Sequence, residues 1–322
     1  MTRVSIGARL HAGFQNLSLA RDRLYGGIGW AIDEPRLVLD VERAEELVCP
    51  DEAVEPYARR AIEALDVPGA EITVEQRFDR HAGLGSGTRL ALASLVGIAD
   101  VYGREVDVRE LAPDLGRGGR SGVGIATFRD GGFVVDGGHP TERFTHSPPE
   151  TGAWRTPPVI ARHPIPDSWR FVLVIPDADA GQSGSTEDAS MRSTVERADP
   201  GIADEIAPLL TQRLLPAIAE GDRRTFGEAI TRLGRLNGAW YADEQGGVYR
   251  PPAGRLIESF SNVSGVSGVG QSSWGPTVYA IADTATADRV REAATDALAD
   301  LDVDGAVRVT GPDNTGYRLE DG

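Results

Sequence analysis

Residues 78–93 read Phe-Asp-Arg-His-Ala-Gly-Leu-Gly-Ser-Gly-Thr-Arg-Leu-Ala-Leu-Ala, the pattern of a strand end, a glycine-rich loop and the start of an apolar helix. Glycines let a ligand approach the backbone, and the N–H groups and dipole of a helix N-terminus attract a phosphate. The spacing fits neither G-x-G-x-x-G nor G-x-x-x-x-G-K-[ST]. The loop therefore predicts phosphate binding, and the alternative is a glycine turn that only feeds a buried helix. The residues expected to line the phosphate site are Gly83, Gly85, Ser86, Gly87 and Thr88.

The charge of the chain restricts its partners. The formal net charge is −16, and all 33 basic residues are arginine, because the sequence contains no lysine. Such a surface is expected of a halophilic protein adapted to high internal salt, where a Debye length of about 3 Å screens self-repulsion. It argues against a nucleic-acid partner, which needs a basic face. Without lysine, a bound phosphate must be met by arginine, backbone N–H groups or a metal ion.

The remaining composition indicates a soluble globular protein of the cytoplasm. Hydrophobic residues make up 40% of the chain and charged residues 25%, which is typical of that class. No apolar run reaches about 18 residues, so we expect no membrane span. The N-terminus enters a strand pattern at once and does not read as a signal peptide. The single Cys49 excludes an internal disulfide and a cysteine metal cluster.

Hydrophobic periodicity predicts an α+β fold in two domains. The first half alternates strands and helices, with its best helix over residues 88–102, and the second half is rich in helices with short antiparallel strands. Residues 140–168 are rich in Pro, Ser and Thr and lack periodicity, so we expect a boundary there that gives domains 1–155 and 156–322. Residues 177–199 are polar and small and are predicted to form a loop or lid.

Three glycine-rich segments at these positions resemble the GHMP superfamily, named for galactokinase, homoserine kinase, mevalonate kinase and phosphomevalonate kinase. Residues 9–11 are similar to the N-terminal motif of that family, and residues 83–88 to its nucleotide phosphate loop. Residues 267–273 are similar to the C-terminal glycine motif that packs against the phosphate loop. The resemblance implies an N-terminal α/β phosphate-loop domain and a C-terminal ferredoxin-like α+β domain. It adds three residues to the predicted phosphate site, namely Gly268, Gly270 and Ser272.

Four segments together resemble one branch of the superfamily, the beta-ribofuranosylaminobenzene 5'-phosphate synthases. They are residues 81–92, 116–124, 131–139 and 272–279. Members of that family transfer the ribosyl phosphate of phosphoribosyl pyrophosphate (PRPP) to a para-substituted benzoate, releasing pyrophosphate and carbon dioxide, in tetrahydromethanopterin biosynthesis. The resemblance implies PRPP and either 4-amino- or 4-hydroxybenzoate as substrates. It also implies Mg²⁺ to bridge the pyrophosphate oxygens and, by analogy, a homodimer.

Polar residues within these segments are the candidates for catalysis. Arg117 and Arg120 lie in a glycine frame and are predicted to bind a phosphate or the benzoate carboxylate, and the alternative is a solvated arginine pair. Asp136 ends a strand between glycine pairs. It is predicted to hold Mg²⁺ together with Ser86, or to stabilise the cation that develops on the ribose, and the alternative is a carboxylate that caps a turn.

Four further side chains are predicted to contact substrate. Arg9 lies beside an apolar strand and is expected to contact substrate, and the alternative is a structural ion pair. His11 and His139 are candidates for proton transfer or substrate contact, and the alternative for each is a purely structural role. Trp274 is predicted to form an aromatic wall for the benzoate ring, although core packing is the commoner role of tryptophan.

One departure from the kinases distinguishes the possible activities. Many GHMP kinases place an aspartate base a few residues after a Ser-Gly step, whereas Ser121-Gly-Val here is followed by Gly124. Phosphorylation of a hydroxyl group therefore lacks its expected base, which favours the transferase. The alternatives are an ATP-dependent small-molecule kinase, whose base would come from elsewhere in the fold, and a non-catalytic phosphate- or nucleotide-binding protein.

Overall fold

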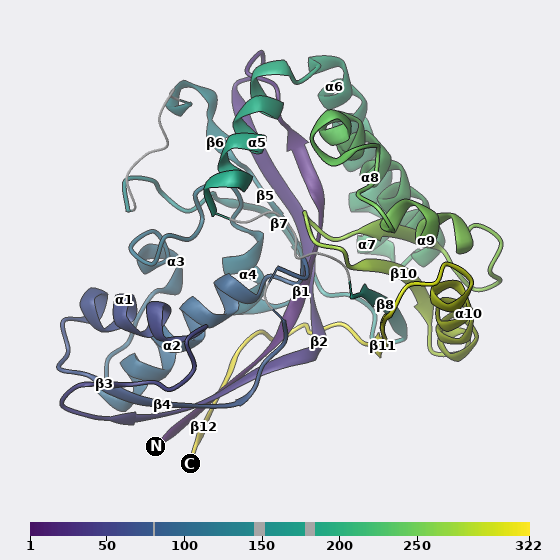
Figure 1. The fold of residues 1–322 in the computed structure, drawn as a ribbon. Helices are drawn as coiled ribbons and strands as arrows, with labels where there is room; N and C mark the ends of the chain where they lie inside the picture. Colours follow the sequence, from purple (N-terminus) through teal and green to yellow (C-terminus); the bar gives the residue numbers. More distant parts are fainter. Residues whose placement is uncertain (80, 145–151, 178–183) are drawn as a thin grey trace.

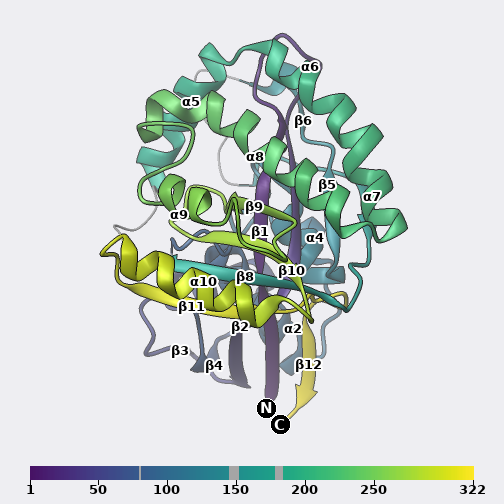
Figure 2. The same ribbon diagram turned by 90° about the vertical axis from the view of Figure 1, so that its right-hand side faces the viewer.

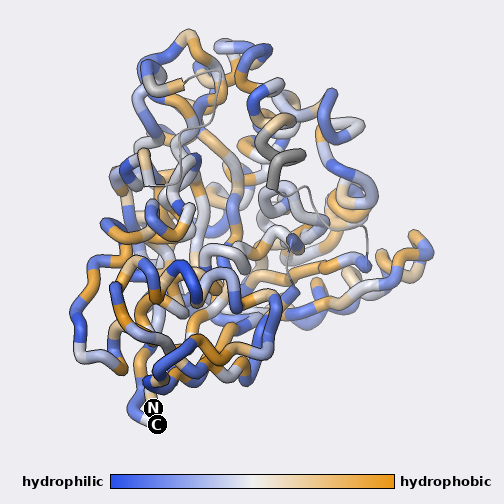
Figure 3. Tube along the Cα trace, turned by 60° about the vertical axis from the view of Figure 1, so that its left-hand side comes forward, coloured by the Kyte–Doolittle hydropathy of each residue, from blue (hydrophilic) through white to orange (hydrophobic). Residues whose placement is uncertain are grey.

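The structure is a computed structural model that describes residues 1–79, 81–144, 152–177 and 184–322. Within these ranges the chain forms two β-sheets with helices packed on them (Figure 1), so the predicted α+β class is confirmed. Hydrophobic and hydrophilic residues alternate along the elements (Figure 3), as expected where each element has one buried face. No helix in the described ranges is both long and apolar enough to cross a membrane.

The first sheet is built on two long antiparallel strands, β1 (Thr2–Asn16) and β2 (Arg23–Arg43). The C-terminal strand β12 (Arg318–Asp321) pairs with β1, so the two termini lie side by side (Figures 1 and 2). The other strands of this sheet are β3 (Leu47–Val48), β4 (Ala70–Gln76), β5 (Phe133–Asp136), β6 (His139–Pro140) and β7 (Val159–His163).

One face of this sheet is covered by the helix that follows the glycine loop. That helix, α2 (Ser86–Val101), is buried along most of its length because it packs between β1, β2 and α1 (Glu55–Leu65). Its apolar residues join those of the sheet in one core cluster. The short helices α3 (Val108–Leu111) and α4 (Val123–Asp130) follow, and a 3₁₀ turn, η1, covers Thr141–Arg143.

The second sheet is antiparallel, in the order β11-β8-β10-β9. Its strands are β8 (Trp169–Pro176), β9 (Gly268–Gln271), β10 (Val278–Asp283) and β11 (Gly305–Thr310). Helices α9 (Ala253–Ser259) and α10 (Ala287–Asp300) share a core cluster with its strands, and Figure 2 shows α10 lying across this sheet.

Residues from the other helices join β1, β2 and the second sheet in a central cluster, which includes Trp30, Phe171 and Phe226. The elements that carry these helical residues are α5 (Gly184–Arg197), α6 (Pro200–Leu209), the π-helical turn η2 (Leu210–Leu214), α7 (Leu215–Glu220) and α8 (Arg223–Gln245). The central cluster thus ties the two sheets together.

One element differs from its prediction. Residues 184–197 form helix α5 instead of the loop expected over 177–199, and residues 178–183 lie outside the described residues. The helix has few apolar residues, and Met191 and Val195 anchor it in the central cluster. The boundary between residues 155 and 156 stays a prediction, and β7 just after it pairs with β5 of the first sheet.

Candidate active site

Two glycine-rich loops meet at the edge where the sheets join. The Ser272 hydroxyl donates to the carbonyl oxygen of Gly83 (2.7 Å), and the Thr277 hydroxyl donates to the carbonyl oxygen of Ala82 (2.6 Å). A side chain on Gly275 would clash with the backbone of Ala82 and Gly83. The third glycine-rich segment therefore packs directly on the predicted phosphate loop, as expected, and Ser272 acts there as a brace for that loop.

Replacing Gly275 with alanine is expected to force the two loops apart, because the added Cβ would overlap backbone atoms that cannot rotate away. Overpacking of this kind typically costs about 1–3 kcal/mol, and urea unfolding measures it. Gly254→Ala in helix α9 is the matched control, since the nearest atom to the added Cβ would be the Cβ of Tyr249, 3.7 Å away. Equal stability of the two variants would contradict the packing described here.

The first loop ends at the N-terminus of α2 in a geometry that suits an anion. Gly85 precedes the helix with a φ of 80°, a left-handed conformation that favours glycine. The N–H groups of Thr88 and Arg89 already donate to the carbonyl oxygen of Gly85. The N–H groups of Ser86 and Gly87 precede them at the helix start, where backbone donors lack intrahelical acceptors. An anion at this end would be met by these two N–H groups and by the helix dipole.

Arginine side chains flank this helix start on two sides. Arg9 lies against Gly85, where a Cβ would come within 2.9 Å of the Arg9 Cγ, and its Nη1 donates to the carbonyl oxygen of Gly83 (2.9 Å). The terminal nitrogens of Arg117 both lie 3.3 Å from the position of a Cβ on Gly87. The Arg117 guanidinium is also stacked over the ring of Tyr57, 4.9 Å from its centroid. The structure thus places Arg9 and Arg117 at the predicted phosphate site.

Arg120 and Thr88 both lie near the N-terminus of α4. Arg120 is half-buried and directly precedes Ser121 in the segment that leads into α4. Thr88 faces the start of α4, since a Cβ on Gly124 would come within 3.2 Å of the Thr88 Cγ2. Substrate contact by either residue stays a prediction.

A buried chain of hydrogen bonds joins Asp136 to His11. The Ser121 hydroxyl donates to Oδ2 of Asp136 (2.9 Å), and Nε2 of His11 lies 3.3 Å from the same hydroxyl oxygen. Because the Ser121 hydroxyl donates its hydrogen to the carboxylate, its oxygen can only accept from His11, so Nε2 of His11 carries the hydrogen of this second bond. Nδ1 of His11 then keeps its lone pair. Gly27 makes room for this chain, since any side chain there would overlap it.

The carboxylate of Asp136 is fully used by protein donors. Oδ2 also accepts from the N–H group of Gly122 (2.7 Å), and Oδ1 accepts from the N–H group of Gly138 (2.8 Å). The N–H group of Gly27 contributes a further bond to the carboxylate. Four donors match the four lone-pair sites of a carboxylate. The prediction that Asp136 holds a metal ion therefore does not fit its contacts.

Burial sets the protonation of this chain. It raises the pKa of Asp136 above its usual value, while the hydrogen bonds from Gly138, Ser121, Gly122 and Gly27 act in the opposite direction. Burial also lowers the pKa of His11 well below its usual value, and the positive charge of Arg9 adds to the effect. His11 is therefore a neutral imidazole at pH 7.

Three other predicted site residues, His139, Gly268 and Gly270, make contacts that hold the fold together. Nε2 of His139 lies 3.1 Å from the carbonyl oxygen of Gly118, which ties β6 to the arginine-bearing segment. Gly268 and Gly270 lie in β9, where side chains would clash with α8 and with the Tyr279 hydroxyl respectively. Close packing of the sheet thus accounts for both glycines, and the structure does not support their assignment to phosphate binding.

A pocket opens beside His11, between β1, α8 and the second glycine-rich loop, and encloses about 480 Å³ including its mouth. The rings of Trp274 and Tyr241 meet edge to face with centroids 4.5 Å apart, and the His11 and Phe14 rings lie 4.9 Å apart. Trp274 therefore lines this pocket, and its contact with a benzoate ring stays a prediction. The further polar residues of its wall are Asn237, Gln245, Tyr249, Gln271 and Ser273. Aromatic walls with a few polar groups suit a planar organic ligand.

Two residues important for this site were not predicted from the sequence. Asn237 of α8 accepts from the N–H group of Phe14 (2.7 Å) and donates to its carbonyl oxygen (3.0 Å), which fixes one pocket wall to the other. Arg89 is fully buried one turn into α2. A lone arginine on the apolar face of the helix was the signal that could have identified Arg89.

Arg89 fixes the position of α2, the helix that follows the phosphate loop, from its buried side. It donates to the carbonyl oxygens of Gly7 (3.0 Å), Ala8 (3.4 Å) and Gly124 (2.6 Å) and to the Thr127 hydroxyl (3.1 Å). Burial lowers its pKa to about 9, so the guanidinium is still charged at pH 7. β1, α2 and α4 are thereby held together.

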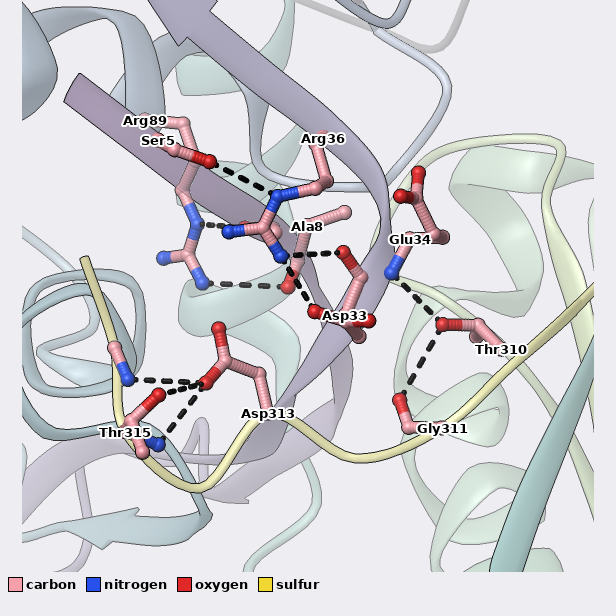
Figure 4. Close-up of polar contacts among 12 residues, drawn as sticks. Ser5, Ala8, Asp33, Glu34, Arg36, Arg89, Thr310, Gly311, Asp313 and Thr315 are labelled. Carbon is pink, nitrogen blue, oxygen red and sulfur yellow. Dashed lines mark hydrogen bonds and ion pairs between the residues drawn. The ribbon is translucent and has the colours of Figure 1, made fainter. Parts of the chain in front are cut away.

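Asp313 lies below this guanidinium in the segment that leads to β12 (Figure 4). Its negative charge raises the pKa of Arg89, against the larger effect of burial. Oδ1 of Asp313 accepts from the N–H groups of Thr315 and Gly316, both at 3.0 Å. Oδ2 is buried and has no hydrogen-bond partner in the described part of the chain.

Two known families match this chain in the regions that build the site. The GHMP kinases N terminal domain matches residues 52–131, and the GHMP kinases C terminal family matches residues 214–300. A solved structure with the same fold is that of the phosphomevalonate kinase of Streptococcus pneumoniae. It aligns with a TM-score of 0.66 at 12% identity and covers 97% of this chain and 99% of its own.

Two curated relatives match over nearly their whole length, and both are named beta-ribofuranosylphenol 5'-phosphate synthase. The protein of Methanothermobacter thermautotrophicus is 32% identical over 97% of this chain and 97% of its own. The protein of Archaeoglobus fulgidus is 33% identical over 99% of this chain and 100% of its own.

Proposed function

Because the chain belongs to the beta-ribofuranosylphenol 5'-phosphate synthase family within the GHMP superfamily, we propose that it transfers the ribosyl 5-phosphate of PRPP to 4-hydroxybenzoate, releasing pyrophosphate and carbon dioxide. The names of the relatives specify a phenol, which favours the hydroxy acid over 4-aminobenzoate. The observation that carries the proposal is the meeting of an anion site with an aromatic pocket at His11.

The anion site suits one phosphate group of PRPP. The N–H groups of Ser86 and Gly87 and the guanidinium of Arg117 converge on the start of α2. These groups are rigid, since the loop is braced by Ser272 and the guanidinium is stacked on Tyr57. Donors fixed in this way stabilise negative charge on a leaving group without reorganising during the reaction.

Mg²⁺ fits this site as an ion carried by the substrate. Among the described residues, no group of three histidine, cysteine or acidic side chains is arranged to hold a metal ion. The hydroxyl of Ser86 lies at the helix start and would supply one oxygen ligand to an ion bound with the phosphate. Mg²⁺ commonly binds through substrate phosphates and a few protein oxygens. Bound there, it would neutralise charge on the departing pyrophosphate.

The pocket suits the acceptor ring. With the benzoate between Trp274 and the β1 wall, the ring carbon that bears the carboxylate attacks C1 of the ribose as the bond to pyrophosphate breaks. The carboxylate then leaves as carbon dioxide, and its electron pair returns to the ring and restores aromaticity. His11, neutral and held by Ser121, lies between the anion site and the pocket. Positioning of this kind is worth about 7–11 kcal/mol of the barrier.

A kinase is the weaker alternative because the site lacks a base for it. The residues that line the pocket include neither aspartate nor glutamate within the described chain. The nearby carboxylate of Asp136 already accepts hydrogen bonds from Ser121, Gly122 and Gly138 and so has no position left to accept a proton from a substrate hydroxyl. A non-catalytic binding protein remains the third alternative and predicts binding without turnover.

The decisive experiment incubates the purified protein in molar KCl with Mg²⁺, PRPP and carboxyl-labelled 4-hydroxybenzoate. Release of carbon dioxide and pyrophosphate in equal amounts is expected. Folded protein that releases neither, but consumes ATP in the presence of a hydroxyl acceptor, would instead be a kinase.

Replacing Arg117 with alanine is expected to lower kcat/KM for PRPP about tenfold, because a charge-assisted contact to phosphate is lost. The KM for the benzoate should stay within about twofold. Arg129→Ala is the control, since Arg129 is an exposed partner of Asp130. Unchanged PRPP kinetics in the Arg117 variant would remove this residue from the phosphate site.

We also propose a cytoplasmic enzyme of a salt-rich cell that forms a homodimer. The acidic, lysine-free composition supports the first part. Activity as a function of KCl concentration tests the salt adaptation, and light scattering tests the dimer.

A further inference from the structure

We propose that Tyr249 determines acceptor specificity, by donating a hydrogen bond from its hydroxyl to the para oxygen of a hydroxylated aromatic acid in the pocket. This inference rests on the function proposed above and goes beyond it by assigning the recognition of the para substituent to one side chain. The ligand class that the site would select is a planar benzoate with oxygen, rather than nitrogen or carbon, at the para position.

The hydroxyl of Tyr249 is a buried polar group whose hydrogen has no acceptor among the described residues, and its side chain lines the pocket. Arg235 interacts with the hydroxyl oxygen, but a guanidinium can only donate, so the hydroxyl hydrogen stays unused. Gly234 of α8 faces it, and a Cβ there would lie 3.7 Å from the hydroxyl oxygen. Buried polar groups in proteins are almost always hydrogen-bonded, because an unmet group loses its contact with water without compensation. A ligand that supplies an acceptor would remove this deficit.

The side-chain amides of the pocket are already engaged. Asn237 bonds to the backbone of Phe14 through both its oxygen and its nitrogen, and its nitrogen also donates to the carbonyl oxygen of Leu233 (3.3 Å). Gln271 accepts from the N–H group of Arg250 (3.0 Å), and Gln245 donates to a backbone carbonyl three residues along the chain (2.8 Å). These bonds hold the amides in place as parts of the pocket wall. The hydrogen of the Tyr249 hydroxyl makes no such bond and can be donated to a ligand.

Tyr249 also lies on the side of the pocket that suits the para position. It packs against the cluster formed by the second sheet with α9 and α10. His11 belongs to the wall formed by β1, and its backbone N–H group donates to the Ser272 hydroxyl that braces the phosphate loop. A ring whose reacting carbon faces the phosphate loop therefore directs its para substituent away from that loop, toward the Tyr249 side.

The protonation of Tyr249 makes it a donor. Burial raises the pKa of its hydroxyl, and the charge of Arg235 and a hydrogen bond from its side chain oppose this only in part. The group therefore remains protonated at neutral pH. A phenol oxygen accepts such a hydrogen bond well. The nitrogen of an aromatic amine shares its lone pair with the ring and is a poor acceptor, and a methyl group accepts nothing.

The test compares binding of 4-hydroxybenzoate, 4-aminobenzoate and 4-methylbenzoate by titration calorimetry, with pyrophosphate and Mg²⁺ present. The native protein is expected to bind the hydroxy acid about tenfold more tightly than the methyl acid. Tyr249→Phe should reduce that ratio to about one. Tyr241→Phe is the matched control from the same pocket, because its hydroxyl already contacts the sulfur of Met191, and it should keep the native ratio.

The outcomes separate this inference from the proposed function. Equal affinity of the native protein for all three acids, or no binding of any of them, would overturn the role of Tyr249 without any variant. A Tyr249→Phe protein that keeps the native ratio would overturn it too. Release of carbon dioxide and pyrophosphate by the native protein decides the function independently. The expected binding ratios without that release would leave the specificity residue in place and reject the transferase.

Discussion

Replacing Arg89 with methionine is expected to lower the free energy of unfolding by about 3–5 kcal/mol, because several buried acceptors lose their donor and a nearby buried carboxylate loses the positive charge that faces it. Methionine fills much of the same volume, so the loss is mainly electrostatic and polar. Asp313 would keep a buried carboxylate without the neighbouring guanidinium. The carbonyl oxygens of Gly7, Ala8 and Gly124 would also lose a donor. Urea unfolding followed by circular dichroism measures the change.

Two further variants identify the cause of that loss. Arg129→Met removes an exposed arginine paired with Asp130 and should cost less than about 1 kcal/mol. The double variant Arg89→Met with Asp313→Asn removes the stranded charge, so part of the stability should return. A double variant less stable than Arg89→Met alone would mean that the Asp313 charge is not what makes Arg89 necessary.

The sequence predicts best those features that lie within one short segment. The phosphate loop could be predicted because its three glycines, its hydroxyl residues and the apolar helix follow one another over residues 83–93. Its contact with the loop around Ser272 was expected from the resemblance and is confirmed by the bonds to Gly83 and Ala82. Local backbone requirements and family motifs are both visible in the order of residues.

Features that depend on distant partners could not be predicted in the same way. Asp136 was expected to hold Mg²⁺, but its donors come from three separate segments around Gly27, Ser121 and Gly138, which no spacing in the sequence relates. Tyr249 gains its place only because α8 brings Gly234 opposite it. Helix α5 was missed because a few buried residues anchor a helix that is otherwise polar.

Glycines illustrate the same limit. Gly85 is needed for a left-handed turn at the start of α2, as the phosphate-loop pattern predicts. Gly268 looks similar in the sequence, yet the structure requires it because α8 approaches β9 too closely for a side chain. A sequence records that a residue is small, and only the fold tells which neighbour requires it.

Replacing Asp136 with asparagine is expected to lower kcat about a hundredfold, the size of effect that follows when a reacting group is misplaced by about 1 Å. In the native protein, the Ser121 hydroxyl and the N–H groups of Gly122 and Gly138 donate to the carboxylate. The NH₂ group of asparagine is itself a donor and would face one or two of these groups, which must then move. His11 loses its support through Ser121. We place Asp136 as a positioning residue because it contacts these protein groups and is fully buried.

The pH profile provides a readout that a purely structural role would not give. The carboxylate of Asp136 must be ionised to accept from Ser121 and the backbone, and burial raises its pKa above the usual aspartate value near 4. Native activity should therefore fall on the acid side at a pH above that value, and Asp136→Asn should lack this limb. Ser121→Ala cuts the link to His11 but keeps the N–H bonds to the carboxylate. It should reproduce most of the loss in kcat, whereas Asp130→Asn, at a half-buried carboxylate paired with Arg129, should reproduce none. If Ser121→Ala keeps full activity while Asp136→Asn does not, Asp136 acts through the glycine turns and not through His11.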